Sequence, residues 1–100
     1  MICEKYNLIK PVVDQCQYNL FFRDKVEVQY RRLFEERKIG AAGWSPLASG
    51  VLTGKYNNGI PEESRFGKNP EWMEVYYRYF SEEKKEATYA ALKKFSDLAK

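Results

Sequence analysis

The residues whose types are best suited to binding chemistry lie in one segment near the middle of the chain, residues 44–56. This segment reads Trp-Ser-Pro-Leu-Ala-Ser-Gly-Val-Leu-Thr-Gly-Lys-Tyr. The indole of Trp44 offers a flat surface for stacking. The short residues that follow can turn successive backbone N–H groups toward one anion, and serine hydroxyls add further donors. The combination is typical of a site for a ligand that carries a ring and a phosphate.

A second candidate lies near the end of an earlier apolar run. Residues 11–16 predict a buried strand that opens with proline, a residue tolerated at the first position of a strand. Gln15 falls near its carboxyl end, and its amide both donates and accepts hydrogen bonds. Taken alone, Gln15 could instead satisfy a buried backbone group, and Trp44 could be a core residue. The residues by themselves leave both interpretations open.

The elements between these candidates predict how they are positioned. Asp24 and Glu27 have the spacing of a capping box, which starts a helix. A second short strand is expected at residues 39–43. The helix between the strands has one apolar stripe, formed by Val26, Tyr30, Leu33 and Phe34. Strand, helix and strand in this order predict two parallel strands joined by a right-handed crossover.

The remaining segments predict mainly helices. Residues 1–6 are expected to end a helix at Asn7 in a left-handed conformation. Residues 56–68 are polar and glycine-containing, which favours a surface excursion. Pro70 and Ser81 are placed to open two further helices. The last helix is expected to bury Ala87, Ala91, Phe95 and Leu98.

Composition excludes several classes of function. The chain has no histidine and only two cysteines, which removes Ser–His and Cys–His nucleophile pairs and most zinc sites. Its net charge of +3 is spread along the chain, unlike the clustered charge of nucleic-acid binders. No apolar run is long enough to span a membrane. We therefore expect a protein of the cytoplasm, with no metal, no nucleic acid and no membrane span.

Two familiar phosphate-binding motifs do not fit. Residues 50–55 are one residue short of the G-x-x-x-x-G-K-[ST] spacing, and Tyr56 stands where a magnesium-binding hydroxyl belongs. A G-x-G-x-x-G motif is also missing. A nucleoside triphosphatase and a classical dinucleotide fold are therefore disfavoured.

Only two strands are expected among several helices that have apolar stripes. Parallel strands are normally covered on both faces, and a sheet of two strands is marginal on its own. The sequence therefore predicts an α/β chain that is a fragment of a larger (β/α) barrel.

The segment from Trp44 to Tyr56 closely resembles the seventh strand and following loop of aldo-keto reductases, especially the voltage-gated potassium-channel β-subunit branch. Residues 15–19 and 25–27 agree with the same branch. The resemblance implies NADPH as cofactor, with Gln15 under the nicotinamide carboxamide and Trp44 stacked on the ring. It implies that Lys55 and Arg65 approach the adenosine-side phosphate. The residues implied to line the pyrophosphate are Ser45, Pro46, Leu47, Ala48 and Ser49.

The same resemblance implies a fold and a domain. Residues 1–100 would be part of a (β/α)8 TIM barrel, an NADP-dependent oxidoreductase domain covering about strands six and seven with their following helices. The Asp, Tyr, Lys and His or Asn tetrad of the family belongs to earlier strands. No catalytic residue is therefore assigned in this chain.

Three hypotheses of function follow from the resemblance. The first is the cofactor-binding portion of a reductase that converts aldehydes and ketones to alcohols. The alternative is a cytoplasmic regulatory β-subunit that binds a potassium-channel α-subunit. The third is that the chain alone is inactive, because the catalytic tetrad lies outside it. Association into a homo-oligomer stays open.

Overall fold

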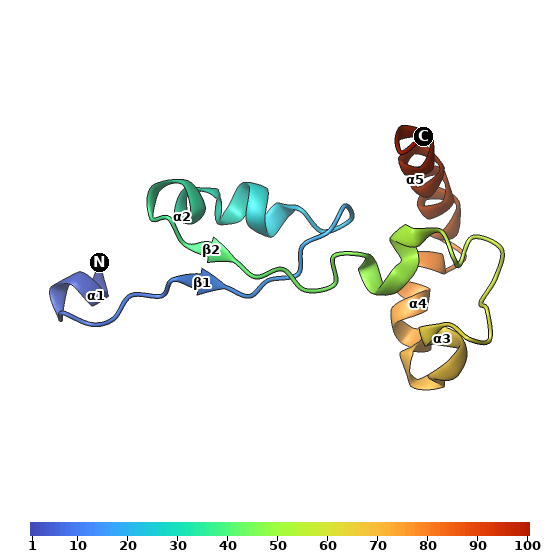
Figure 1. Cartoon of the computed structure of the whole chain (residues 1–100), viewed down its shortest axis with the longest axis horizontal. Coiled ribbons are helices and arrows are strands. Elements are labelled where there is room, and N and C mark those ends of the chain that lie inside the picture. Colours follow the sequence, from blue (N-terminus) through green and yellow to red (C-terminus); the bar gives the residue numbers. More distant parts are fainter. The chain divides into compact units, whose positions relative to one another are not determined.

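The computed structural model describes residues 1–100, which form two compact units, Met1–Pro46 and Leu47–Lys100. We call them the N-terminal unit and the C-terminal unit and describe each by itself (Figure 1). The boundary falls inside the segment 44–56, so the two parts of that segment belong to different units.

The N-terminal unit contains a short parallel ladder. Its elements are α1 (Ile2–Lys5), β1 (Val13–Asp14), the π-helical turn η1 (Lys25–Gln29), α2 (Arg31–Glu36) and β2 (Gly40–Ala41). β1 and β2 pair in parallel, with Val13 opposite Gly40 (Figure 1). Hydrogen bonds from Gly40 N–H to Val12 O (2.8 Å) and from Ala42 N–H to Asp14 O (2.9 Å) extend the pairing beyond the two named strands. The predicted order of strand, helix and parallel strand is confirmed, with shorter strands than expected.

The predicted capping box is wrong. Asp24 has helical dihedral angles (φ −59°, ψ −40°), and its side chain caps no N–H group. Glu27 accepts hydrogen bonds from Tyr18 and Arg23 instead. The helical segment opens as a π-turn and becomes α-helical only after Tyr30, where φ is −106°.

The predicted end of the first helix is confirmed. Asn7 has φ 53°, and the N–H of the following Leu8 donates to Cys3 O at 2.8 Å. Asparagine tolerates this left-handed conformation better than most residues, which suits it to end a helix.

The C-terminal unit packs around a group of aromatic rings. Its elements are the 3₁₀ turns η2 (Ala48–Thr53), α3 (Arg65–Lys68), the 3₁₀ turn η3 (Pro70–Trp72), α4 (Met73–Phe80) and α5 (Lys85–Leu98). The rings of Tyr56 and Phe66 lie 4.8 Å apart between centroids, and those of Tyr76 and Phe80 also lie 4.8 Å apart. Tyr89 of α5 joins the cluster through Phe80 at 5.2 Å. The cluster therefore joins α3, α4 and α5.

Residues 56–68 form more than a surface excursion. Tyr56 and Phe66 are buried, at 0% and 2% exposure. Ser64 starts α3, because its hydroxyl accepts a hydrogen bond from the N–H of Gly67 at 3.1 Å. The segment contributes two core residues that its polar composition conceals.

The face that the last helix buries agrees only in part with the expected one, because Ala91 and Phe95 are half-buried whereas Ala87 is exposed. Ser81 ends α4, and α5 begins at Lys85. Thr88 and Leu92 are its buried residues, whereas Leu98 is 84% exposed. The hydroxyl of Thr88 donates to the carbonyl of Tyr79 at 2.6 Å, and this bond allows a polar side chain to be buried between α4 and α5.

Candidate functional site

The carboxyl ends of the two strands lie side by side in the N-terminal unit. Beyond the named strands, Gln17 forms a parallel bridge with Trp44. The N–H of Trp44 donates to Cys16 O at 2.9 Å, and the carbonyl of Trp44 accepts from Tyr18 N–H at 3.3 Å. Since side chains alternate along a strand, this register places Gln15, Gln17 and Trp44 on one face.

Gln15 and Trp44 are both accessible on that face. Gln15 is exposed and its amide makes no hydrogen bond in the chain, so it does not satisfy a buried backbone group. Trp44 is 46% exposed, so about half of its surface is open in this chain. Both side chains are free to contact a ligand at the carboxyl edge of the ladder.

The turn after β2 is held by a residue that sequence reasoning did not assign. Ser45 has φ 52°, and its carbonyl accepts a hydrogen bond from Asn19 Nδ2 at 2.9 Å. Asn19 Oδ1 accepts from the N–H groups of Phe21 and Phe22, at 2.9 and 3.1 Å. An asparagine that closes such a turn directly after a strand is a recognised local signal. The bond to Ser45, in contrast, joins distant parts of the sequence.

The second part of the predicted loop lies in the C-terminal unit. Leu47 has φ −105° and ψ 15°, whereas Ala48 and Ser49 have φ 50° and 58°. A right-handed conformation followed by left-handed ones turns successive N–H groups toward one side, as anion-binding nests do. The N–H groups of Leu47, Ala48 and Ser49 have no acceptor in the chain. This stretch therefore offers unused donors.

Lys55 and Arg65 supply positive charge in the same unit, and neither forms an ion pair. The Lys55 side chain lies against Gly50, since a Cβ built there would be 3.5 Å from its Cε. The Arg65 guanidinium lies over the ring of Trp72, at 5.3 Å from the centroid. Contact between Tyr56 and Phe66, the residues that follow them, links the two segments.

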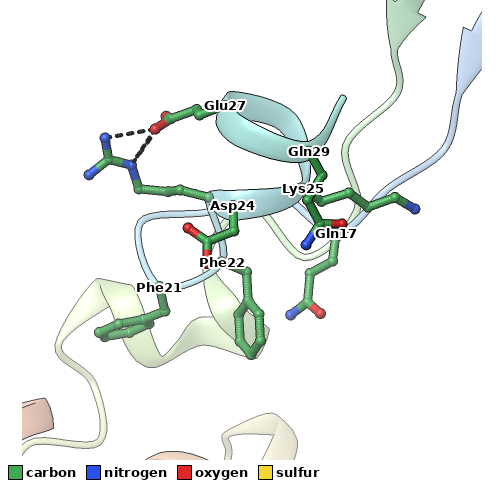
Figure 2. A pocket seen from close by; sticks show the side chains of 8 residues that line it. Gln17, Phe21, Phe22, Asp24, Lys25, Glu27 and Gln29 are labelled. Carbon is green, nitrogen blue, oxygen red and sulfur yellow. Dashed lines mark hydrogen bonds and ion pairs between the residues drawn. The ribbon is translucent and has the colours of Figure 1, made fainter. Parts of the chain in front are cut away.

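A hollow of about 810 Å³ lies beside the carboxyl end of β1 (Figure 2). Its lining includes Gln17, Phe22, Asp24 and Glu27. Dashed lines in Figure 2 mark the interactions of the labelled Glu27. Arg23 binds Glu27 with a shortest distance of 2.8 Å. This pair, followed by the hydrogen bond from Tyr18, lowers the pKa of Glu27. An ionised Glu27 thus fixes the start of the helical segment at the edge of the hollow.

The structure contains no cluster of three or more His, Cys, Asp or Glu side chains that could hold a metal ion. None of its helices has the length and apolar character that crossing a membrane would need.

Cys16 is a structural thiol next to this site. It is 1% exposed, and burial followed by the neighbouring Asp14 raises its pKa. Cys3 is only partly buried. Because thiolate is the reactive form, we expect iodoacetamide to alkylate Cys16 at least about tenfold more slowly than Cys3 at neutral pH. Mass spectrometry of timed reactions measures both rates. In urea the two alkylation rates should be equal. Equal rates in buffer would contradict the burial of Cys16.

Comparison with known proteins places these features in a family. The model of the aldo/keto reductase family matches residues 1–100. A protein of Arabidopsis thaliana described as a probable voltage-gated potassium channel subunit beta is 53% identical over 64 residues, which are 63% of this chain. The match covers 20% of that relative, so the chain spans about a fifth of its length.

Proposed function

We propose, from the premise that the chain belongs to the aldo/keto reductase family, that it forms the cofactor-binding part of an NADPH-dependent reductase of aldehydes and ketones. The observation that carries the proposal is the parallel ladder, which leaves Trp44 half exposed at the strand ends and on the face of Gln15. Active sites of (β/α) barrels lie at this edge.

Within each unit, the side chains and N–H groups suit one part of a reduced dinucleotide. Gln15 would bind the carboxamide of the nicotinamide, because its free amide can donate and accept. Trp44 would stack on the ring. Lys55 and Arg65, neither of which forms an ion pair, would bind the phosphate that distinguishes NADPH from NADH. The segment proposed for the pyrophosphate comprises Ser45, Pro46, Leu47, Ala48 and Ser49. NADPH, when bound, supplies the reducing equivalents for the carbonyl group.

We further propose that residues 1–100 are part of a (β/α)8 barrel domain and cover about its sixth and seventh strands. Support comes from the two faces of the strand. The side chains of Val12 and Val13 point to opposite faces, and they are 74% and 53% exposed, so both faces are uncovered in this chain. Strands of parallel sheets are normally covered on both faces. The catalytic residues would lie outside this chain, which by itself would be inactive.

A second candidate function is a cytoplasmic regulatory subunit of a voltage-gated potassium channel. The identity of 53% to the Arabidopsis thaliana relative, which is described as a probable voltage-gated potassium channel subunit beta, favours it. Co-purification of the complete polypeptide with a channel α-subunit would support this function. Its failure to associate where both are expressed would argue against it.

The test of the reductase uses the complete polypeptide that contains this chain. We expect it to bind NADPH and to oxidise it in the presence of an aldehyde. Replacement Trp44→Ala should weaken NADPH binding by about 10- to 100-fold, because loss of one ring stack costs about 1–3 kcal/mol. Isothermal titration calorimetry measures the dissociation constant.

The matched control is Trp72→Phe, which changes the other tryptophan and keeps a ring beside Arg65. It should bind NADPH as the wild type does. Wild-type protein that ignores NADPH would refute the proposed function, and an unchanged Trp44→Ala variant would refute the role of Trp44.

A further inference from the structure

We propose that Asn19 is a positioning residue, which holds the turn after β2 in the conformation that presents Trp44 and Ser45 to the cofactor. The inference rests on the proposed function and extends it to a residue outside the predicted cofactor contacts. Asn19 is 6% exposed, and its side chain acts on the turn through a backbone carbonyl.

Both polar atoms of the Asn19 side chain form hydrogen bonds. Its Oδ1 accepts from two consecutive N–H groups, those of Phe21 and Phe22, and so closes its own turn. Its Nδ2 donates to the carbonyl of Ser45 at 2.9 Å. One end thus anchors Asn19 to the turn after β1, and the other end binds the turn after β2.

The bond to Ser45 continues the parallel ladder past its last backbone bond. The backbone bonds run from Gly40 N–H to Val12 O through Trp44 N–H to Cys16 O, and end with Tyr18 N–H to Trp44 O. Beyond this point the backbone of Ser45 turns to φ 52° and leaves the ladder. The amide of Asn19 then supplies the next bond.

Ser45 needs such support because a non-glycine residue with positive φ is in a sparsely populated conformation. Without the bond from Asn19, the carbonyl of Ser45 would be free to rotate toward extended conformations. Trp44 directly precedes this turn, so the orientation of its ring would no longer be fixed from the carboxyl side. Cofactor affinity should therefore depend on Asn19.

Two variants of the complete polypeptide separate the two ends of the side chain. Asn19→Asp keeps the acceptor for Phe21 and Phe22 and loses the donor to Ser45. Asn19→Ser is uncharged, and its hydroxyl can still accept from a nearby backbone N–H but is too short to reach Ser45. We expect both to weaken NADPH binding about tenfold, the factor that loss of one hydrogen bond gives. The control Asn58→Ser makes the same change at an exposed position and should bind normally.

A second measurement needs no cofactor. Hydrogen exchange followed by mass spectrometry should show faster exchange of a peptide covering residues 44–46 in both Asn19 variants, with residues 85–98 unchanged. This readout separates loss of the turn from loss of the whole fold, because global unfolding would accelerate exchange in both peptides.

The outcomes distinguish this proposal from the proposed function. Folded variants with unchanged NADPH affinity and unchanged exchange at residues 44–46 would overturn the role of Asn19, although the reductase would stand. Wild-type protein without NADPH affinity would refute the reductase and the cofactor role of Asn19 together. Faster exchange at residues 44–46 with unchanged NADPH affinity would also overturn the role of Asn19, since the turn would then not set cofactor binding.

Discussion

Replacement of Phe66 by alanine is expected to lower the free energy of unfolding of the C-terminal unit by about 3–5 kcal/mol. Phe66 is 2% exposed, and its ring lies 4.8 Å from Tyr56 and 5.6 Å from Tyr76 between centroids. Alanine would remove these contacts and leave a cavity between rigid rings, which cannot collapse fully. Urea unfolding followed by the fluorescence of Trp72 and the tyrosines measures the change.

The control for this variant is Tyr56→Phe, in the ring that Phe66 contacts. Tyr56 is fully buried, and its hydroxyl has no hydrogen-bond partner. Removing an unpaired buried hydroxyl while keeping the ring should leave stability unchanged or raise it slightly. A Phe66→Ala variant that loses less than about 1 kcal/mol would show that this cluster is not the core of the unit.

The importance of Phe66 could not be predicted from the composition of its segment. Residues 56–68 average to a polar, glycine-containing stretch, and one aromatic residue does not create a periodic pattern. Ser64 is a recognisable cap residue, but a Glu or Gln three positions later is needed for a capping box, and Gly67 stands there. The burial of Phe66 depends on contacts with Tyr56 and Tyr76, which lie outside its own helix.

The parallel ladder, in contrast, was predictable because its signals are local. Two short apolar runs separated by one amphipathic helix leave few arrangements for the strands. The capping box failed for the opposite reason. Glu27 can either cap its own helix or accept from Tyr18 and Arg23. Arg23 lies four residues earlier, a spacing at which side chains can pair, but the sequence does not reveal that Tyr18 also lies close.

The same contrast between local signals and contacts of distant residues applies to the candidate site. Gln15 and Trp44 were predicted because each lies near the end of a recognisable strand, and the register then brings them onto one face. Asn19 was not assigned, because its bond to Ser45 joins residues 26 apart in the chain. Only the pairing of the two strands makes that bond possible.

Replacement of Gly67 by alanine is expected to destabilise the C-terminal unit by about 3 kcal/mol, although this glycine is exposed. A Cβ at this position would overlap the carbonyl oxygen of Pro61 and lie 2.7 Å from the carbonyl oxygen of Glu62. Both atoms belong to the backbone, so no side-chain rotation relieves the contact. The carbonyl of Pro61 also accepts hydrogen bonds from the N–H and the hydroxyl of Ser64, at 3.0 and 2.6 Å.

Relief of the overlap would therefore require residues 61–62 to move away from α3 and from Ser64, its cap. That movement would break the bonds of Ser64 to Pro61 and withdraw its hydroxyl from the N–H of Gly67. The control is Gly40→Ala, whose Cβ would meet only Val12 O at an ordinary 3.6 Å and should change stability by less than about 0.5 kcal/mol. Urea unfolding compares the two variants. Equal stability would mean that the close approach of residues 61–62 to α3 is absent in solution, and with it the cap that places Phe66 in the core.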